Sequence, residues 1–252
     1  NNAMVKPLLF FLKQNYLFVL AFALLGSFLV HNFDSIGQDI GRHLKIGEII
    51  WQTHEVPKTN LFSFTEPDFP FINHHWLSEV VFSSIFSWSG FTGLIWLKVF
   101  VVFAAFLLLL LTTSNVVTTF DVNQRKQVVF WPLIISFLLS IFIFIERTEV
   151  RPEMFSFAIL SFFLFAIFRA KYQRNYSYLW FLPVIELFWV NLHIYFFIGP
   201  FLLLAFLIDR LINLDNKRES GSLLKFGGEE SDAKKRPILP FVGVSFKGIL
   251  VV

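Results

Sequence analysis

The sequence predicts an all-α fold: a polytopic transmembrane helix bundle of about six to seven spans, with a long first external loop that contains two interfacial helices. Composition supports the membrane class, because 56% of the 252 residues are hydrophobic, 15% are charged and the mean hydropathy is +0.65. A soluble domain has about 25% charged residues. The hydrophobic residues also form separate segments, and a helix of about 20 mostly apolar residues is long enough to cross a bilayer.

Six apolar segments are candidate spanning helices, of which the fourth and fifth are short. They cover residues 8–30, 92–113, 128–145, 154–168, 179–189 and 195–212. The run 238–252 is too short to span alone, and we expect it to begin a further, truncated segment. The expected organisation is therefore a transmembrane core over 4–212, a cytoplasmic linker over 213–237 and this last segment.

The distribution of Lys and Arg predicts how the bundle is oriented. When the loop 31–79 is placed outside, fourteen Lys and Arg residues lie in inside segments and six lie outside. Basic residues collect on the cytoplasmic side of membrane proteins. We therefore expect a multi-pass protein of the cytoplasmic (inner) membrane, with a cytoplasmic N-terminus and the loop 31–79 on the external face.

The loop 31–79 is the one long polar interval in the N-terminal half of the chain. It holds five of the six histidines and seven of the eighteen acidic residues. A first helix is expected over 38–51. In that helix Asp39, Arg42 and His43 stand at positions i, i+3 and i+4, so they share a face.

The second loop helix begins near His75 and ends at a break formed by Ser89 and Gly90. Most of its other positions are apolar, which is typical of a helix that lies in the membrane interface with its apolar side in lipid. Its polar residues recur at every fourth position and form one stripe, at His75, Glu79, Ser83 and Ser87.

Asp39 is the leading candidate for the chemical centre, as a carboxylate general base at a helix start. The competing interpretation is that Asp39 is only an N-cap, which is a common role for Asp at this position. The histidines of the loop are either metal ligands, with Asp34 or Asp39, or ordinary residues of the membrane interface. No tight ligand spacing such as HExxH is present, so we assign no metal site, and a divalent metal stays an open alternative.

Two short segments are expected at the same external face as the loop. The first, 146–153, contains Arg147 and Arg151, which either grip a phosphate in bidentate fashion or form salt bridges with neighbouring glutamates. The second, 189–193, contains Asn191 and His193, which either serve a site or hydrogen-bond across helices. Glu186 lies inside the fifth apolar segment, where an ionisable residue needs a polar cavity or a partner such as these arginines.

Several function classes are excluded by what the sequence lacks. There are no cysteines, so disulfides and thiolate chemistry are ruled out. No basic cluster interleaved with aromatics lies in a soluble region, so no nucleic-acid partner is expected. The sequence also contains no phosphate-binding glycine loop, no GxSxG element and no dinucleotide-binding fingerprint.

A series of short motifs follows the order of these segments. They are Asp39-Ile-Gly-Arg42-His43, Gly47-Glu48-Ile49-Ile50, Val56-Pro57, Phe62-Ser63-Phe64-Thr65, His74-His75-Trp76-Leu77-Ser78-Glu79, Arg151-Pro152 and Trp189-Val190-Asn191-Leu192-His193. This layout resembles the GT-C superfamily of membrane glycosyltransferases, which includes protein O-mannosyltransferases and the aminoarabinose transferases of lipid A. The resemblance covers roughly residues 8–212 and is most similar to a poorly characterised bacterial branch.

The resemblance implies transfer of a sugar from a polyprenyl-phosphate donor, outside the cytoplasmic membrane, to an acceptor glycan, lipid or protein. It implies that Asp39 is the catalytic base, and Asp34 is the second acidic candidate. The residues expected to bind donor phosphate or substrate are Arg42, His43, His74, His75, Glu79, Arg147, Arg151, Asn191 and His193.

Two departures from the family pattern stand out. His74 and His75 occupy the place where the aminoarabinose branch has a Lys, and a neutral imidazole is a poorer phosphate partner than Lys. The chain also has fewer spans than family members. The alternative function is a non-catalytic membrane transporter or a protein that binds a lipid-linked glycan. A transporter is disfavoured because no internal repeat is visible, and no positive feature supports a structural assembly protein.

Overall fold

The computed structural model describes residues 16–30, 39–66, 69–117, 122–145 and 149–219. Within these ranges the regular structure is helical, apart from one isolated antiparallel bridge between Thr59 and Pro70. The helices are α2 (Tyr16–Leu29), α3 (Ile40–Thr53), α4 (Trp76–Val117), α5 (Val122–Ile145), α6 (Glu153–Gln173), α7 (Leu182–Leu192) and α8 (Ile198–Glu219), with short 3-10 helices η2 (Ser177–Phe181) and η3 (Ile194–Phe197).

Three helical segments are long and apolar enough to cross a membrane, namely Trp76–Thr113, Glu153–Gln173 and Ile194–Asn213. Shorter apolar helices add Tyr16–Leu29, Pro132–Ile143 and Ser177–Leu192. All six expected apolar segments therefore contain helix. The fourth is longer than the sequence pattern indicated, because α6 continues five residues past Phe168. α8 likewise continues to Glu219, into the stretch expected to be linker, while 220–252 lies outside the described residues.

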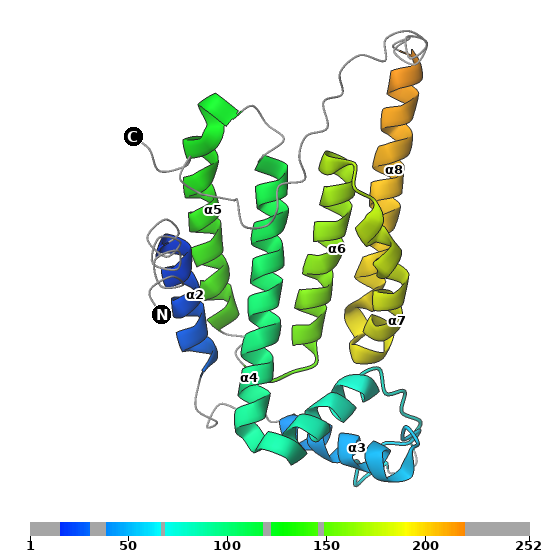
Figure 1. Cartoon of the computed structure of the whole chain (residues 1–252). Coiled ribbons are helices and arrows are strands. Elements are labelled where there is room, and N and C mark those ends of the chain that lie inside the picture. Colours follow the sequence, from blue (N-terminus) through cyan, green and yellow to red (C-terminus); the bar gives the residue numbers. More distant parts are fainter. Residues whose placement is uncertain (1–15, 31–38, 67–68, 118–121, 146–148, 220–252) are drawn as a thin grey trace, which may run out of the picture.

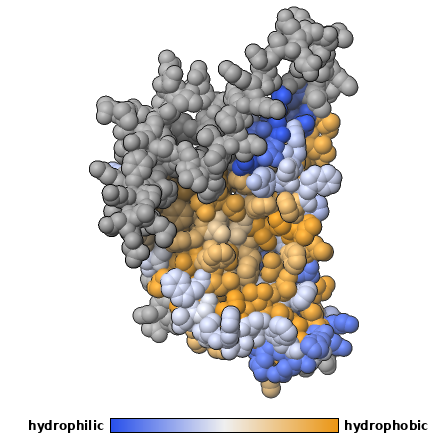
Figure 2. Space-filling model, in the orientation of Figure 1, coloured by the Kyte–Doolittle hydropathy of each residue, from blue (hydrophilic) through white to orange (hydrophobic). Residues whose placement is uncertain are grey.

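The helices form an elongated bundle with a crosspiece at one end (Figure 1). α2, α5, α6, α7, α8 and the later part of α4 run alongside one another. α3 and residues 76–89 of α4 lie across the end of the bundle, and we call these two segments the platform. Figure 2 shows apolar residues over the side of the bundle and more polar residues at the platform end.

Gly90 produces the bend between the platform and the rest of α4. Its backbone angles are φ 61° and ψ −154°, inside an otherwise helical run from Trp76 to Val117. This conformation is essentially restricted to glycine, because a Cβ atom would clash with the neighbouring backbone. The break expected at Ser89 and Gly90 is thus confirmed, and it allows one helix to supply both a platform segment and a long apolar segment.

The second helix of the platform packs part of its polar stripe inward. Glu79 and Ser83 are buried, as is the adjacent Ser78, whereas Ser87 at the end of the stripe is exposed. On the other side, Trp88 is 92% exposed, whereas Phe82 is fully buried against α6 through Phe155. The apolar side of this helix is therefore partly exposed and partly packed in the core. The buried part of the polar stripe lies against α3.

Buried apolar clusters hold the platform to the bundle. One cluster joins α3, α4 and α6 through residues that include Ile40, Phe82 and Met154. Separate clusters join α2 to α4 and α5, and α6 to α7 and α8. Burial of apolar area is the main favourable term in such packing, so the platform is fixed to α4 and α6 by the same kind of contact that holds the bundle together.

Gly47 sets how closely α3 approaches α4. A Cβ added at Gly47 would lie 2.1 Å from the Glu79 carbonyl oxygen and 2.7 Å from Ser83 Cβ. Gly41, on the same helix, has nothing within 4 Å of such an atom. The absence of a side chain at Gly47 therefore permits backbone-to-backbone contact at the centre of the platform.

Gly47→Ala is expected to push α3 away from α4 and to lower the free energy of unfolding by about 1–3 kcal/mol, as overpacked cores do. Gly41→Ala is the matched control, and it should be neutral or slightly stabilising because Ala favours a helix. Thermal unfolding of both variants in detergent micelles measures the difference. Equal melting temperatures for the two variants would contradict the packing described for Gly47.

Candidate functional site

A buried carboxylate, that of Glu79, lies at the centre of the candidate site. His43 Nδ1 lies 2.9 Å from Glu79 Oε1, and the Asn73 amide nitrogen donates a hydrogen bond to Glu79 Oε2. His43 is 3% exposed and Glu79 is 1% exposed. The three residues come from α3, from the turn before α4 and from α4, so one carboxylate ties together three separate segments.

This arrangement determines which nitrogen of His43 carries a proton. A carboxylate only accepts hydrogen bonds, so His43 Nδ1 must donate to Glu79. In neutral His43 the second nitrogen, Nε2, is then a base. The assignment follows from the hydrogen-bond network. A carboxylate that orients an imidazole in this way is common wherever histidines bind or transfer protons.

His43 and two further histidines, His75 and His193, form a row that leads from the platform to the bundle. The His43 ring lies 6.2 Å from the His75 ring, edge to face, and the His75 ring stacks on His193 at 5.1 Å with an interplanar angle of 22°. His43 belongs to α3, His75 precedes α4, and His193 ends α7. The expectation that the loop and the segment 189–193 meet at one end of the bundle is therefore confirmed.

A second buried network fixes His193. Trp189 Nε1 donates to Ser156 Oγ over 2.8 Å, and Ser156 Oγ lies 2.9 Å from His193 Nδ1. The serine hydroxyl accepts from the indole N–H and still has one proton and one lone pair, so the direction of its hydrogen bond with His193 depends on which ring nitrogen of His193 carries the proton. The alternative that His193 hydrogen-bonds across helices is confirmed, since its partner belongs to α6.

Burial keeps the inner two histidines neutral. Desolvation lowers the pKa of His193 from 6.5 to about 4, and the neighbouring His75 and His43 act in the same direction. Burial also lowers the pKa of His75, helped by His43 and opposed by Glu79, with smaller lowering effects from Arg42 and His74. The Nδ1 atom of His75 is buried without a hydrogen-bond partner. These rings therefore offer neutral hydrogen-bonding groups rather than positive charges at pH 7.

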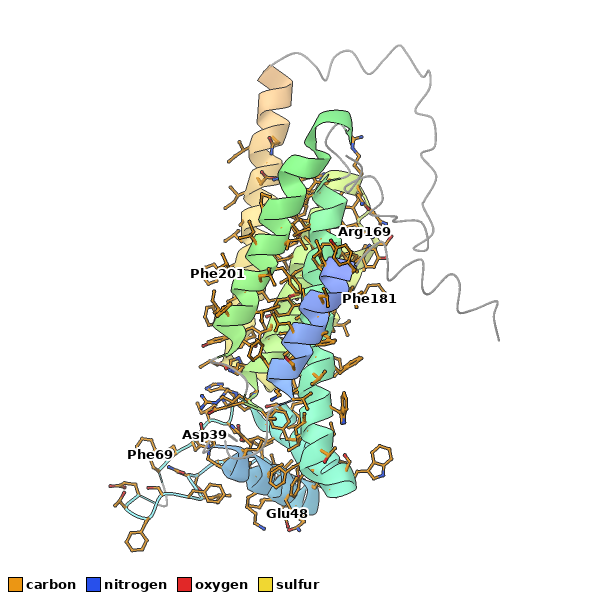
Figure 3. All side chains as sticks on the ribbon, turned by 90° about the vertical axis from the view of Figure 1, so that its left-hand side faces the viewer. Asp39, Glu48, Phe69, Arg169, Phe181 and Phe201 are labelled. Atoms are coloured by element: carbon orange, nitrogen blue, oxygen red, sulfur yellow. The ribbon has the colours of Figure 1, made fainter. Side chains whose placement is uncertain are left out.

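Asp39 differs from the histidines in being exposed. It occupies the N-cap position of α3 with φ −84° and ψ −18°, and its side chain makes no capping hydrogen bond. Its carbonyl oxygen does accept the His43 backbone N–H. Figure 3 shows Asp39 at the start of α3, where the platform meets the end of the bundle. The N-cap interpretation fails for its side chain, because the geometry of the carboxylate leaves it available for other contacts.

The candidate phosphate-binding residues differ in their exposure and in their partners. Arg42 and His74 are exposed. Arg151 forms an ion pair with Glu149, with its guanidinium nitrogen 2.5 Å from the carboxylate oxygen, so the salt-bridge alternative holds for this residue. The Nε atom of Arg151 is buried without a partner. Asp34 and Arg147 lie outside the described residues.

Asn191 serves as a link between α4 and α7. It accepts a hydrogen bond from Trp76 Nε1 at 2.8 Å and donates to the Leu187 carbonyl oxygen. This is the cross-helix bond that the sequence left open for Asn191. Within the described part of the chain, no group of three or more His, Asp or Glu residues is arranged to hold a metal ion.

Two residues of the site were missed by sequence reasoning. Ser156 lies in an apolar helix between two phenylalanines, where nothing local marks it as a partner for Trp189 and His193. Asn73 could have been found from its position just before a helix. In the structure its side-chain oxygen accepts the His75 backbone N–H at 2.9 Å. An Asn just before a helix commonly makes this kind of turn, but its second bond to Glu79 could not be read from spacing alone.

Stability is expected to fall in acid because of His193. An unfolded chain takes up the proton near pH 6.5, whereas the folded state resists until about pH 4. Between these values the unfolded state binds more protons, so the free energy of unfolding decreases as the pH falls and is constant above this window. His193→Gln should weaken this dependence, as measured by melting temperature from pH 4 to 8. His74→Gln, at an exposed histidine, is the control. If His193→Gln leaves the fall in melting temperature between pH 6.5 and 4 unchanged, the low pKa of His193 is not its cause.

Comparisons with protein-family models, with curated proteins and with solved structures gave no match to this chain. What the site can do is therefore inferred from its own residues. These are an exposed carboxylate and an exposed arginine at the start of the platform, beside a row of three histidines in which hydrogen bonds hold the two outer members, His43 and His193.

Proposed function

We propose that the chain is a membrane glycosyltransferase, similar in layout to the GT-C superfamily, that moves a sugar from a polyprenyl-phosphate donor to an acceptor hydroxyl. In this proposal six helices span the inner membrane, the N-terminus is cytoplasmic, and the platform lies on the external face. The observation that carries the proposal is the gathering of Asp39, Arg42 and the three neighbouring histidines His43, His75 and His193 at one end of an apolar helix bundle.

The surface of the platform supports its location at a membrane interface. Trp51 and Trp88 are exposed, with Trp88 at 92%. Aromatic residues of this kind are enriched at membrane–water boundaries, where the ring contacts lipid and its edge contacts water. A donor whose prenyl chain lies in the lipid would present its phosphate and sugar at this level, next to the start of α3.

The reaction needs a base and a stabilised leaving group. Asp39 would accept the proton of the acceptor hydroxyl, whose oxygen then forms a bond to the anomeric carbon. The bond from that carbon to the phosphate oxygen breaks, and its electron pair leaves on the polyprenyl phosphate. Arg42, one helical turn after Asp39, is placed to neutralise that charge. The anomeric carbon is inverted, because attack and departure occur on opposite faces.

The buried histidines suit a supporting role better than a charge-carrying one. Burial lowers the pKa of His193 and keeps the ring neutral, while Glu79 fixes the orientation of His43. A neutral imidazole has one donor and one acceptor nitrogen, so it can orient sugar hydroxyls or a phosphate without adding charge. The charged contact to phosphate is then left to the exposed Arg42.

Asp39→Asn is expected to reduce sugar transfer by about 10²-fold or more, the usual contribution of a general base. The assay uses full-length protein, synthetic polyprenyl-phosphate sugars and chromatographic detection of product. Glu48→Gln is the matched control, since Glu48 is a carboxylate of the same helix that pairs with Lys45. An exposed pair of this kind contributes little to stability, so this variant should keep full activity.

Transfer that survives Asp39→Asn at the wild-type rate would remove Asp39 as the base. A second outcome concerns the non-catalytic alternative. If the wild-type protein binds polyprenyl-phosphate sugars in an equilibrium binding assay but transfers none of them to glycan, lipid or peptide acceptors, the chain is a binding protein for lipid-linked glycans and the transferase proposal fails.

A further inference from the structure

Glu186 is an acidic residue inside the apolar helix α7. It lies on the inward face of that helix with Leu182 and Trp189, one turn from each, and both of these are buried. The outward face carries Leu187 and Phe188, which are exposed. The carboxylate is thus directed away from the lipid side and into the contact between α7 and its neighbours.

The surroundings of the Glu186 carboxylate are apolar and tight. A Cβ built at Gly199 of α8 would lie 2.4 Å from Glu186 Oε2 and 2.9 Å from Phe163 Cε1 of α6. Both carboxylate oxygens are inaccessible to solvent, and neither has a hydrogen-bond partner. The carboxylate therefore occupies the space that the missing side chain of Gly199 leaves open, against an aromatic ring.

The charged groups on α6 and α8 lie at other levels or have other contacts. On α6, Arg169 is about 9 Å farther along the axis than Phe163, at 1.5 Å per residue, and it stacks on Phe165 and Tyr178. Glu153, at the opposite end of α6, is about 15 Å from Phe163 on the same scale. On α8, Asp209 is likewise about 15 Å beyond Gly199 and pairs with Lys171.

Arg151 and His193 do not supply a counter-charge to Glu186 either. Arg151, expected from the sequence as a partner for Glu186, pairs with Glu149 instead. The nearest titratable residue along α7 is His193, which follows Glu186 by seven residues and bonds Ser156. Neither carboxylate oxygen of Glu186 has a hydrogen-bond partner among the described residues.

We propose that Glu186 is a proton-binding site in the apolar part of the bundle, occupied at neutral pH. An ionised carboxylate without a partner in such surroundings is very costly, whereas the neutral acid costs far less. Proton release would require water or a cation to reach the carboxylate. Because Gly199 packs directly on it, release is coupled to separation of α7 from α8. This inference does not depend on the proposed transferase activity.

Infrared difference spectroscopy tests the protonation state directly. The full chain in lipid nanodiscs at pH 7 is compared with Glu186→Gln, and the difference is expected to contain the carbonyl stretch of a protonated carboxyl group. Glu48→Gln is the control, because Glu48 is ion-paired at the surface and should contribute only carboxylate bands. If the difference spectrum between wild type and Glu186→Gln contains carboxylate bands in place of the protonated carbonyl stretch, the proposal is wrong.

A chemical test uses the wild-type chain and does not depend on the variant folding. A hydrophobic carbodiimide adds to a protonated carboxyl in an apolar site, and the adduct rearranges to a stable acylurea that peptide mass mapping locates. We expect this label on the peptide that contains Glu186, and a water-soluble carbodiimide should label Glu48 and leave Glu186 unmodified. Labelling of Glu186 by the water-soluble reagent alone would contradict the proposal.

The coupling to α8 is tested with Gly199→Ala. The added methyl group must displace the carboxylate or α8, so Glu186 should become reactive toward the water-soluble carbodiimide, and its protonated carbonyl band should weaken at pH 7. Gly41→Ala serves as the control, since a Cβ there meets nothing within 4 Å. If Gly199→Ala leaves the reactivity of Glu186 and its band unchanged, the coupling between proton release and the α7–α8 contact is wrong.

Discussion

The buried carboxylate of Glu79 is the interaction on which the candidate site depends. A charge removed from water is stable only when hydrogen bonds replace its hydration. His43 and Asn73 supply these bonds, and they come from two segments outside α4. The position of α3, and with it the position of Asp39, therefore follows from satisfying one carboxylate.

The platform also separates two kinds of polar group. Groups that must keep a fixed geometry are buried in networks, as His193 is with Ser156 and Trp189. Groups whose charge is useful to a ligand, such as Asp39 and Arg42, stay exposed at the start of α3. Low dielectric strengthens hydrogen bonds in the first set, while hydration preserves the charge of the second.

Hydrophobic periodicity and glycine placement predicted most of the fold. The apolar segments, the two loop helices and the break at Gly90 all follow from local pattern, and helical alternation places the external segments at one end. Partnerships were harder to predict. The local sequence around Ser156 or Arg151 does not tell whether that residue contacts a ligand or another side chain of the protein. The partner of Ser156, His193, lies 37 residues away along the chain, and spacing carries no information about such a contact.

The bend at Gly90 also makes the candidate site sensitive to the lipid around it. The platform and the long apolar part of α4 are one continuous backbone, joined at Gly90. In a bilayer thinner than its apolar length, such a helix tilts to keep its side chains in hydrocarbon. The same tilt would raise one edge of the platform and lower the other, so acyl-chain length would alter the depth of Asp39 relative to the headgroups.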